Sequence, residues 1–234
     1  MIRASQILPP RLQDVRERMA AAAAHAGRSV AQITLVAVSK AQPLDMLRAA
    51  AALGVRDFGE SYLNDAVEKL DALAAEPLTW HFLGRLQANK TRTIAERFQW
   101  VHSVDRLHIA QRLSAQRPFH APPLQVCIQV NLGAEAGKGG VAPAAIGALA
   151  VAVAELPRLR LRGLMCLPPV EADAARQRGW FAQLRALRDD LNAHGMQLDT
   201  LSMGMSGDFE SAILEGATMV RIGTALFGPR PARP

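Results

Sequence analysis

Short runs of aliphatic and β-branched residues alternate along the chain with longer segments in which apolar residues recur every three or four positions. A parallel strand that is covered on both faces is apolar at nearly every position, so the short runs predict buried strands. The longer segments are typical of amphipathic helices. We expect eight strands, over residues 33–40, 55–60, 78–84, 100–104, 123–132, 159–167, 198–203 and 218–223.

A helix or a turn is predicted after each of these strands. The helices are expected over residues 43–53, 61–76, 86–98, 106–116, 143–154, 171–194 and 208–216, and a short turn follows the last strand. Pro43 suits the first position of a helix and Gly54 suits its carboxyl cap. Ser61, Asp105 and Asp208 have side chains that typically cap amino termini, so we predict three N-caps there.

Eight successive β/α units in 234 residues favour an α/β fold of the (β/α)8 TIM barrel type. The alternative is a doubly wound open sheet, which normally has fewer strands and a glycine fingerprint after the first strand. Here Ser39 and Lys40 end that strand. An additional helix over residues 5–26, within an N-terminal segment 1–27, should pack on the outside of the barrel. We predict one domain over 1–234, with a tail from 229 to 234.

The composition is that of an ordinary globular protein, with 50% hydrophobic and 21% charged residues. No uncharged apolar run is long enough to cross a bilayer, and the N-terminus lacks an apolar signal core, so we expect a cytoplasmic protein with no membrane partner. Cys127 and Cys166 each lie alone in an apolar stretch. We therefore expect buried free thiols and no metal site.

Positive charge raises the question of nucleic-acid binding, because the net charge is +6 and the pI is near 10.1. The arginines, however, alternate with acidic residues on predicted helices, which favours a solvated surface and no nucleic-acid partner. Only four of the 27 basic residues are lysines, namely Lys40, Lys69, Lys90 and Lys138. Arginine forms no imine, so a retained lysine hints that an amine is required.

Lys40 is the principal candidate for chemistry. The active site of such a barrel lies at the carboxyl ends of its strands, and Lys40 ends the first, wholly apolar strand. Partial removal from water favours the neutral amine that attacks a carbonyl. The alternative is a lysine that extends to solvent at the rim. Other candidates at strand ends are Glu60, Ser61, His81, Gly84, Asn131, Met165 and Cys166.

The loops after the seventh and eighth strands resemble a phosphate site. Barrels often bind phosphate there, on backbone N–H groups at the start of a short helix. The loop 202–208 offers the hydroxyl of Ser206, and Gly223 with Thr224 follows the last strand. Glycine lets a backbone approach an anion closely. Two ordinary turns are the alternative interpretation.

A lysine amine and a phosphate site at one barrel mouth suit an aldehyde that carries a phosphate, and pyridoxal 5′-phosphate fits that description. Arg221 could then donate a hydrogen bond to the pyridine nitrogen. A guanidinium cannot accept a proton, so it disfavours a protonated ring and weakens the electron sink of pyridoxal chemistry. The alternative for Arg221 is an ion pair with Glu210 or Glu215.

Seven stretches together are highly specific: LVAVSK (35–40), RDFGES (56–61), WHFLGRLQANK (80–90), HSVDR (102–106), RLRGLM (160–165), LSMGMSGDFESAI (201–213) and MVRIGTALFG (219–228). Through them the chain resembles the pyridoxal phosphate homeostasis protein family, whose fold is similar to the N-terminal barrel of bacterial alanine racemase. The resemblance implies an imine at Lys40, a phosphate held by Ser206, Gly223 and Thr224, and Arg221 facing the pyridine nitrogen. It also implies a monomer that influences vitamin B6 pools, with no established turnover.

One position departs from the family pattern. The family usually has Glu-Asn-Tyr after the second strand, whereas this chain has Glu60-Ser61-Tyr62. The shorter serine is expected to leave the contact of the asparagine amide with the cofactor ring to water. Lys138 lies in a glycine-rich loop after the fifth strand, where it is either a transient acceptor during cofactor transfer or a solvated lysine.

The expected function is therefore a carrier or regulator of pyridoxal phosphate without catalytic residues, with apo forms of pyridoxal-dependent enzymes as partners. A pyridoxal-dependent amino-acid racemase is the alternative. Racemisation requires proton delivery on both faces of the substrate carbanion. Racemases of this type use a second, β-rich domain and a tyrosine, whereas this chain ends soon after its eighth strand and its single tyrosine, Tyr62, starts a helix. A phosphosugar isomerase would need a carboxylate such as Glu60, which leaves Lys40 unexplained.

Overall fold

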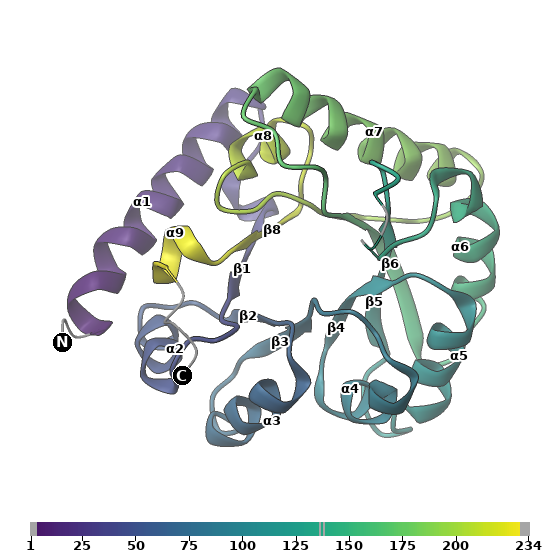
Figure 1. Ribbon diagram of the computed structural model, residues 1–234, viewed down its shortest axis with the longest axis horizontal. Helices are drawn as coiled ribbons and strands as arrows, with labels where there is room; N and C mark the ends of the chain where they lie inside the picture. The colour runs from purple at the N-terminus through teal and green to yellow at the C-terminus, as the bar shows by residue number, and fades with distance from the viewer. Residues whose placement is uncertain (1–3, 136, 138, 230–234) are drawn as a thin grey trace.

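Eight parallel strands form a closed barrel in the computed structural model, which describes residues 4–135, 137 and 139–229 (Figure 1). The strands are β1 (Thr34–Val38), β2 (Asp57–Glu60), β3 (Thr79–Phe82), β4 (Trp100–Val104), β5 (Leu124–Val130), β6 (Leu159–Cys166), β7 (Thr200–Ser202) and β8 (Met219–Ile222). They pair in sequence order, and β8 closes the barrel against β1. The prediction of a (β/α)8 barrel is confirmed.

The helices surround the barrel on its outer side (Figure 1). They are α1 (Ala4–His25), α2 (Leu44–Ala52), α3 (Leu63–Ala72), α4 (Thr91–Arg97), α5 (Leu107–Gln116), α6 (Ile146–Ala154), α7 (Ala174–Ala193), α8 (Phe209–Leu214) and α9 (Thr224–Phe227). Single 3₁₀ turns span Val30–Gln32, Ala88–Lys90 and Pro143–Ala145. Within the described residues, no helix has the length and apolar character needed to traverse a bilayer.

The additional N-terminal helix packs on the outside of the barrel, as predicted. Its apolar face buries Leu8, Leu12, Val15 and Met19, and it contacts α2, α8 and α9 (Figure 1). This placement is consistent with the expected periodicity, because residues three and four apart lie on one face of a helix.

Several predicted boundaries were wrong at the ends that face the carboxyl side of the barrel. The N-cap of α3 is Tyr62 rather than Ser61, and that of α5 is Arg106 rather than Asp105. Asp208 does occupy the N-cap position of α8, but its carboxylate accepts from the backbone N–H of Met205, at 2.6 Å, and not from the helix. Asp208 thus stabilises the loop before the helix, and Asp105 pairs with the adjacent Arg106, so a local capping rule misjudged both side chains.

Side chains on each strand alternate between the barrel interior and the layer under the helices. On β1, Leu35 and Ala37 contribute to the large core under the helices, whereas Val36 belongs to a separate interior cluster. That interior cluster consists of Val36, Trp100, Cys127, Met165 and Met219, with Leu167 packed against it. By the same alternation, Val38 and Lys40 share the inward face of Val36, and both line the cavity at the carboxyl end of the barrel.

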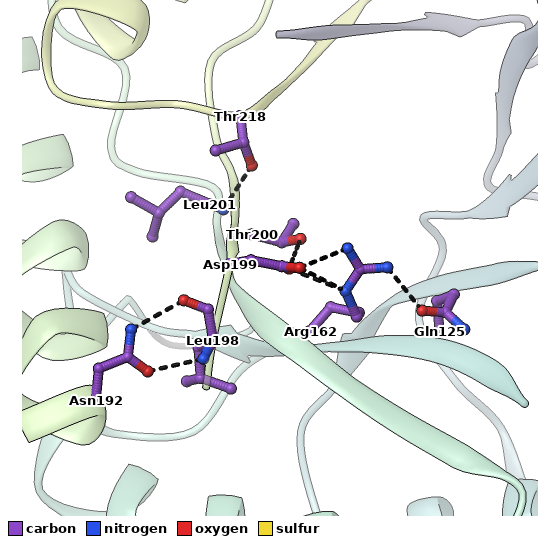
Figure 2. Close-up of polar contacts among 8 residues, drawn as sticks. All are labelled: Gln125, Arg162, Asn192, Leu198, Asp199, Thr200, Leu201 and Thr218. Carbon is purple, nitrogen blue, oxygen red and sulfur yellow. Dashed lines mark hydrogen bonds and ion pairs between the residues drawn. The ribbon is translucent and has the colours of Figure 1, made fainter. Parts of the chain in front are cut away.

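Side-chain hydrogen bonds join the strands at the amino end of the barrel, opposite the cavity (Figure 2). They support β7, which has only three residues. Arg162 of β6 makes a bidentate contact with the carboxylate of Asp199, with N–O distances of 2.6 and 2.9 Å. It also donates to the amide oxygen of Gln125 on β5 at 2.8 Å. One planar guanidinium therefore joins three neighbouring chain segments at this end.

Candidate functional site

A cavity of about 240 Å³ opens at the carboxyl end of the barrel. This is somewhat smaller than the pockets of roughly 300–1,000 Å³ that hold drug-sized ligands, so it suits a small metabolite. Its walls are formed by Val38, Lys40, Ser61, Leu83, Met165, Leu167, Met205, Ser206, Gly207, Arg221, Gly223 and Thr224. All five residues predicted to bind the cofactor thus line one cavity.

Lys40 follows β1, and the backbone beside it is fixed by a buried polar cluster. The Ser39 hydroxyl donates to Oε1 of Glu60 at 2.6 Å, and Nζ of Lys69 donates to the same oxygen at 2.7 Å. Nζ of Lys69 also donates to the carbonyl of Ser39 at 2.8 Å. Ala41 has a left-handed backbone with φ of 59°. The half-buried Lys40 is therefore held between a fixed strand end and a sharp turn.

Glu60 belongs to this cluster and not to the wall of the cavity. Its side chain is fully buried, and burial raises the pKa of its carboxyl group despite the neighbouring Lys69 ammonium. The cluster thus stabilises the strand ends beneath Lys40. As the carboxylate required for an isomerase, Glu60 is poorly placed, because it is occupied by Ser39 and Lys69.

The loops after β7 and β8 are joined to each other beside the cavity. The backbone N–H of Ala225 donates to Oγ of Ser206 at 3.1 Å, and the N–H of Arg221 donates to the carbonyl of Gly204 at 2.9 Å. Gly204 has φ of 93°, and a β-carbon there would lie 2.6 Å from that of Ala212. Only glycine fits this turn, which brings Ser206 close to the residues that follow β8.

Arg221 lines the cavity, and the residue is buried. Nη1 donates to Oγ of Ser202 at 2.7 Å, and Nη2 donates to the carbonyl of Cys166 at 2.8 Å. Burial lowers the pKa of this guanidinium from its ordinary value, although it stays a cation at any physiological pH. Two of its donors are thus engaged by neighbouring strands while the side chain still forms part of the cavity wall.

The alternative role for Arg221, an ion pair with Glu210 or Glu215, was wrong. Glu210 instead pairs with Arg18 of α1 at 2.8 Å, and Glu215 pairs with two arginines of α7. Both glutamates lie on the outer layer, whereas Arg221 occupies an inward position of β8. The alternation of a strand therefore separates charges that are close in sequence.

A line of polar side chains inside the barrel was not predicted. Ser202, the acceptor of Arg221, lies 2.7 Å from Nδ1 of His102. Nε2 of His102 is 2.9 Å from Nδ1 of His81, and Nε2 of His81 is 2.9 Å from a carboxylate oxygen of Asp57. His81 and His102 occupy inward positions of adjacent strands, and this alternation is the sequence signal that could have identified them.

Several strand-end candidates do not reach the cavity. His81 lies in the barrel interior, and Cys166 contributes only its backbone carbonyl to the contact with Arg221. Asn131 exchanges hydrogen bonds with the backbone of Glu135. Gly84 allows close packing, because a β-carbon there would lie 2.1 Å from the carbonyl oxygen of Ser61. Ser61 and Met165 do line the cavity, while Lys138 lies outside the described residues.

Both cysteines are free and buried, as expected. Burial raises the pKa of each thiol, Cys127 and Cys166, to about 12. Among the residues that the structure describes, no group of three or more His, Cys, Asp or Glu side chains is arranged to hold a metal ion.

Comparison with known proteins agrees with this architecture. The family model for the alanine racemase N-terminal domain matches residues 11–231. The pyridoxal phosphate homeostasis protein of Pseudomonas aeruginosa is 60% identical over 216 residues, which cover 92% of this chain and 93% of that protein.

Solved structures give the same picture. PipY of Synechococcus elongatus, in a structure with PLP bound, is 38% identical and has a TM-score of 0.80, covering 92% of this chain and all of that one. The alanine racemase of Corynebacterium glutamicum has a TM-score of 0.68 at 19% identity, covering 94% of this chain and 62% of that one, and thus shares the fold. The chain therefore belongs to the alanine racemase N-terminal domain family and, within it, to the pyridoxal phosphate homeostasis proteins.

Proposed function

We propose that this protein binds pyridoxal 5′-phosphate in the cavity through an imine with Lys40, and acts in the homeostasis of that cofactor as a carrier or regulator. The observation that carries the proposal is the convergence of an amine, a buried guanidinium and two polar loops on one small cavity. The PLP-bound structure of PipY, at 38% identity, supports the choice of ligand.

The lining residues suit the chemical groups of this ligand. The neutral amine of Lys40 would condense with the aldehyde, forming a C=N bond and releasing one water molecule. Ser206, Gly223 and Thr224 would hold the phosphate on the side of the cavity formed by the loops after β7 and β8. Arg221 would donate to the pyridine nitrogen, and the apolar side chains of the wall would cover the ring.

A carrier role fits the cavity better than racemisation does. A racemase needs proton donors on both faces of the reacting carbon. Among the described lining residues, Lys40 is the one side chain with an ordinary acid–base function, since Arg221 stays protonated. Tyr62 is 44% exposed and lies outside the cavity wall. We therefore propose that the protein delivers the cofactor to apo forms of pyridoxal-dependent enzymes. We further propose that it acts as a single-domain monomer in the cytoplasm.

Attachment at Lys40 is tested by mixing purified protein with pyridoxal phosphate, recording visible absorbance, reducing with borohydride and locating the adduct by peptide mass spectrometry. We expect one adduct on Lys40 in the wild type. Lys40→Ala and Lys40→Arg should both lose it, because arginine keeps the charge but forms no imine. Lys90→Ala, on a 3₁₀ turn away from the cavity wall, is the matched control and should retain the adduct.

Two outcomes would contradict this proposal. The wild type could stay colourless with added cofactor, or Lys40→Ala could form an adduct with unchanged stoichiometry. The carrier role is tested separately, by incubating the loaded protein with an apo pyridoxal enzyme and following recovery of that enzyme's activity. Loss of optical rotation from an amino acid in the presence of the loaded protein would instead favour the racemase.

A further inference from the structure

Five side chains form a continuous line of hydrogen bonds through the barrel, from the cavity to the opposite end. In order, these residues, which we call the polar chain, are Arg221, Ser202, His102, His81 and Asp57, with successive donor–acceptor distances of 2.7, 2.7, 2.9 and 2.9 Å. Arg221 lines the cavity, and Asp57, the first residue of β2, lines a cleft at the other end. The polar chain thus spans the length of the interior.

When both imidazoles are neutral, the chemistry of the two ends fixes the direction of every hydrogen bond in the polar chain. Arg221 has no acceptor, so Ser202 must accept from it. The carboxylate of Asp57 has no donor, so Nε2 of His81 must carry a proton. Nδ1 of a neutral His81 is then an acceptor, and it must receive a proton from Nε2 of His102. Nδ1 of His102 is consequently an acceptor as well, and the Ser202 hydroxyl donates to it.

In this assignment both imidazoles have the same neutral tautomer, with the proton on Nε2. Burial lowers the pKa of His81 and, more strongly, that of His102, against the raising effect of Asp57 on His81. Two titratable groups face His102: the Arg221 cation from β8 and the His81 imidazole from β3. The ring of Trp100 stacks on His81, with ring centroids 5.7 Å apart.

A protonated His102 would break the order of the polar chain. Its Nδ1–H would donate to the Ser202 oxygen, so the Ser202 hydroxyl would lose its acceptor, and the imidazolium would place a second positive charge beside a buried guanidinium. A neutral His102 instead leaves each hydrogen with one acceptor. The interior therefore offers a single arrangement in which all of these polar atoms are satisfied.

We propose that Ser202, His102, His81 and Asp57 are positioning residues that fix the orientation of the Arg221 guanidinium toward the cavity. With Nη1 engaged by Ser202 and Nη2 by the Cys166 carbonyl, contacts to two strands set the plane of the guanidinium and so fix the directions of its remaining N–H donors. Toward the ligand, this inference rests on the proposed function. The tautomers of the two histidines follow from the protein alone.

The first test uses the wild-type protein without cofactor. Long-range ¹H–¹⁵N spectra of histidine-labelled protein distinguish the two neutral tautomers from the cation. We expect both His81 and His102 to show a protonated Nε2 and an unprotonated Nδ1 at neutral pH. A cationic His102, or a proton on its Nδ1, would overturn the polar chain whatever the protein binds.

The second test compares Ser202→Ala with Ser202→Thr. Alanine removes the atom shared by Arg221 and His102, so we expect the dissociation constant of pyridoxal phosphate to rise about tenfold, or about 1.4 kcal/mol, which is close to the value of one hydrogen bond to a charged group. The visible absorbance of the bound cofactor should also change its pH profile, because Arg221 is no longer fixed. Threonine keeps the hydroxyl and should restore most of the affinity and the profile.

Ser103→Ala is the matched control, because this buried β4 serine donates to the Gly84 carbonyl and lies outside the polar chain. Circular dichroism verifies that each variant is folded. If the wild type binds the cofactor and Ser202→Ala matches it in affinity and pH profile, the positioning role is refuted. If the wild type forms no adduct, the proposed function fails, while the histidine spectra still decide whether the polar chain exists.

Discussion

Lys69→Met should destabilise the protein strongly, because it removes one member of a buried ion pair. Nζ of Lys69 makes two hydrogen bonds, at 2.7 Å to Glu60 and at 2.8 Å to the Ser39 carbonyl. The two charged side chains are 10% and 0% exposed, and Oε2 of Glu60 is among the buried atoms that have no hydrogen-bond partner. Methionine has a similar length but leaves Glu60 as a buried charge. Breaking such a pair typically costs about 3–5 kcal/mol.

The pH dependence of this loss identifies its cause. Burial already raises the pKa of Glu60, and removal of the Lys69 ammonium raises it further. A group whose pKa is higher in the folded state than in the unfolded state stabilises the protein at low pH, and this contribution is lost as the pH rises through the folded pKa. The deficit of Lys69→Met should therefore be smallest in mild acid, near the ordinary pKa of a glutamate, and should grow toward neutral pH.

The assay is urea unfolding of the wild type and variants, in mild acid and at neutral pH. The double variant Lys69→Met, Glu60→Gln removes both charges and should recover much of the stability, because a neutral pair has a smaller cost of burial. Lys90→Met is the matched control and should stay within about 0.5 kcal/mol of the wild type. A Lys69→Met protein that unfolds like the wild type at neutral pH would refute the reasoning.

Two further predictions concern the backbone and the thiols. Gly204→Ala should lower the free energy of unfolding by about 1–3 kcal/mol, because it combines a left-handed backbone with a contact of 2.6 Å to Ala212. Gly179→Ala on α7, where a β-carbon meets nothing within 4 Å, should instead stabilise by roughly 0.5–1 kcal/mol, and thermal unfolding compares the two. Cys127 and Cys166, with pKa raised to about 12, should resist a thiol reagent at pH values well below 12 and react once urea unfolds the chain. Rapid labelling of the folded protein would contradict their burial.

The barrel and its cavity could be predicted from the sequence because they depend on local patterns. Continuous apolar runs define strands, and the end of a strand defines the mouth of a barrel, so Lys40 and Arg221 were placed without any knowledge of contacts. Ser206, Gly223 and Thr224 followed from the position of their loops after the last two strands. Each of these inferences needs only the order of elements along the chain.

The partners of those residues could not be predicted in the same way. Whether Arg221 meets a serine of β7 or a glutamate of α8 depends on which side of a strand each residue faces and on the stagger between strands. The contact between His81 and His102 likewise joins two strands whose register is set by the whole barrel. The predicted caps at Ser61 and Asp105 were wrong by one residue, because α3 and α5 begin only after Tyr62 and Arg106.

The outer helix α1 couples the N-terminus to one side of the cavity. It packs on α8 and α9, which directly follow the two loops that carry Ser206 and Gly223, and Arg18 ties it to Glu210 of α8. An N-terminal truncation or a bulky N-terminal affinity tag should accordingly loosen first the side of the cavity that the loops after β7 and β8 form. Ligand-binding measurements on this protein are therefore best made after an N-terminal tag has been removed.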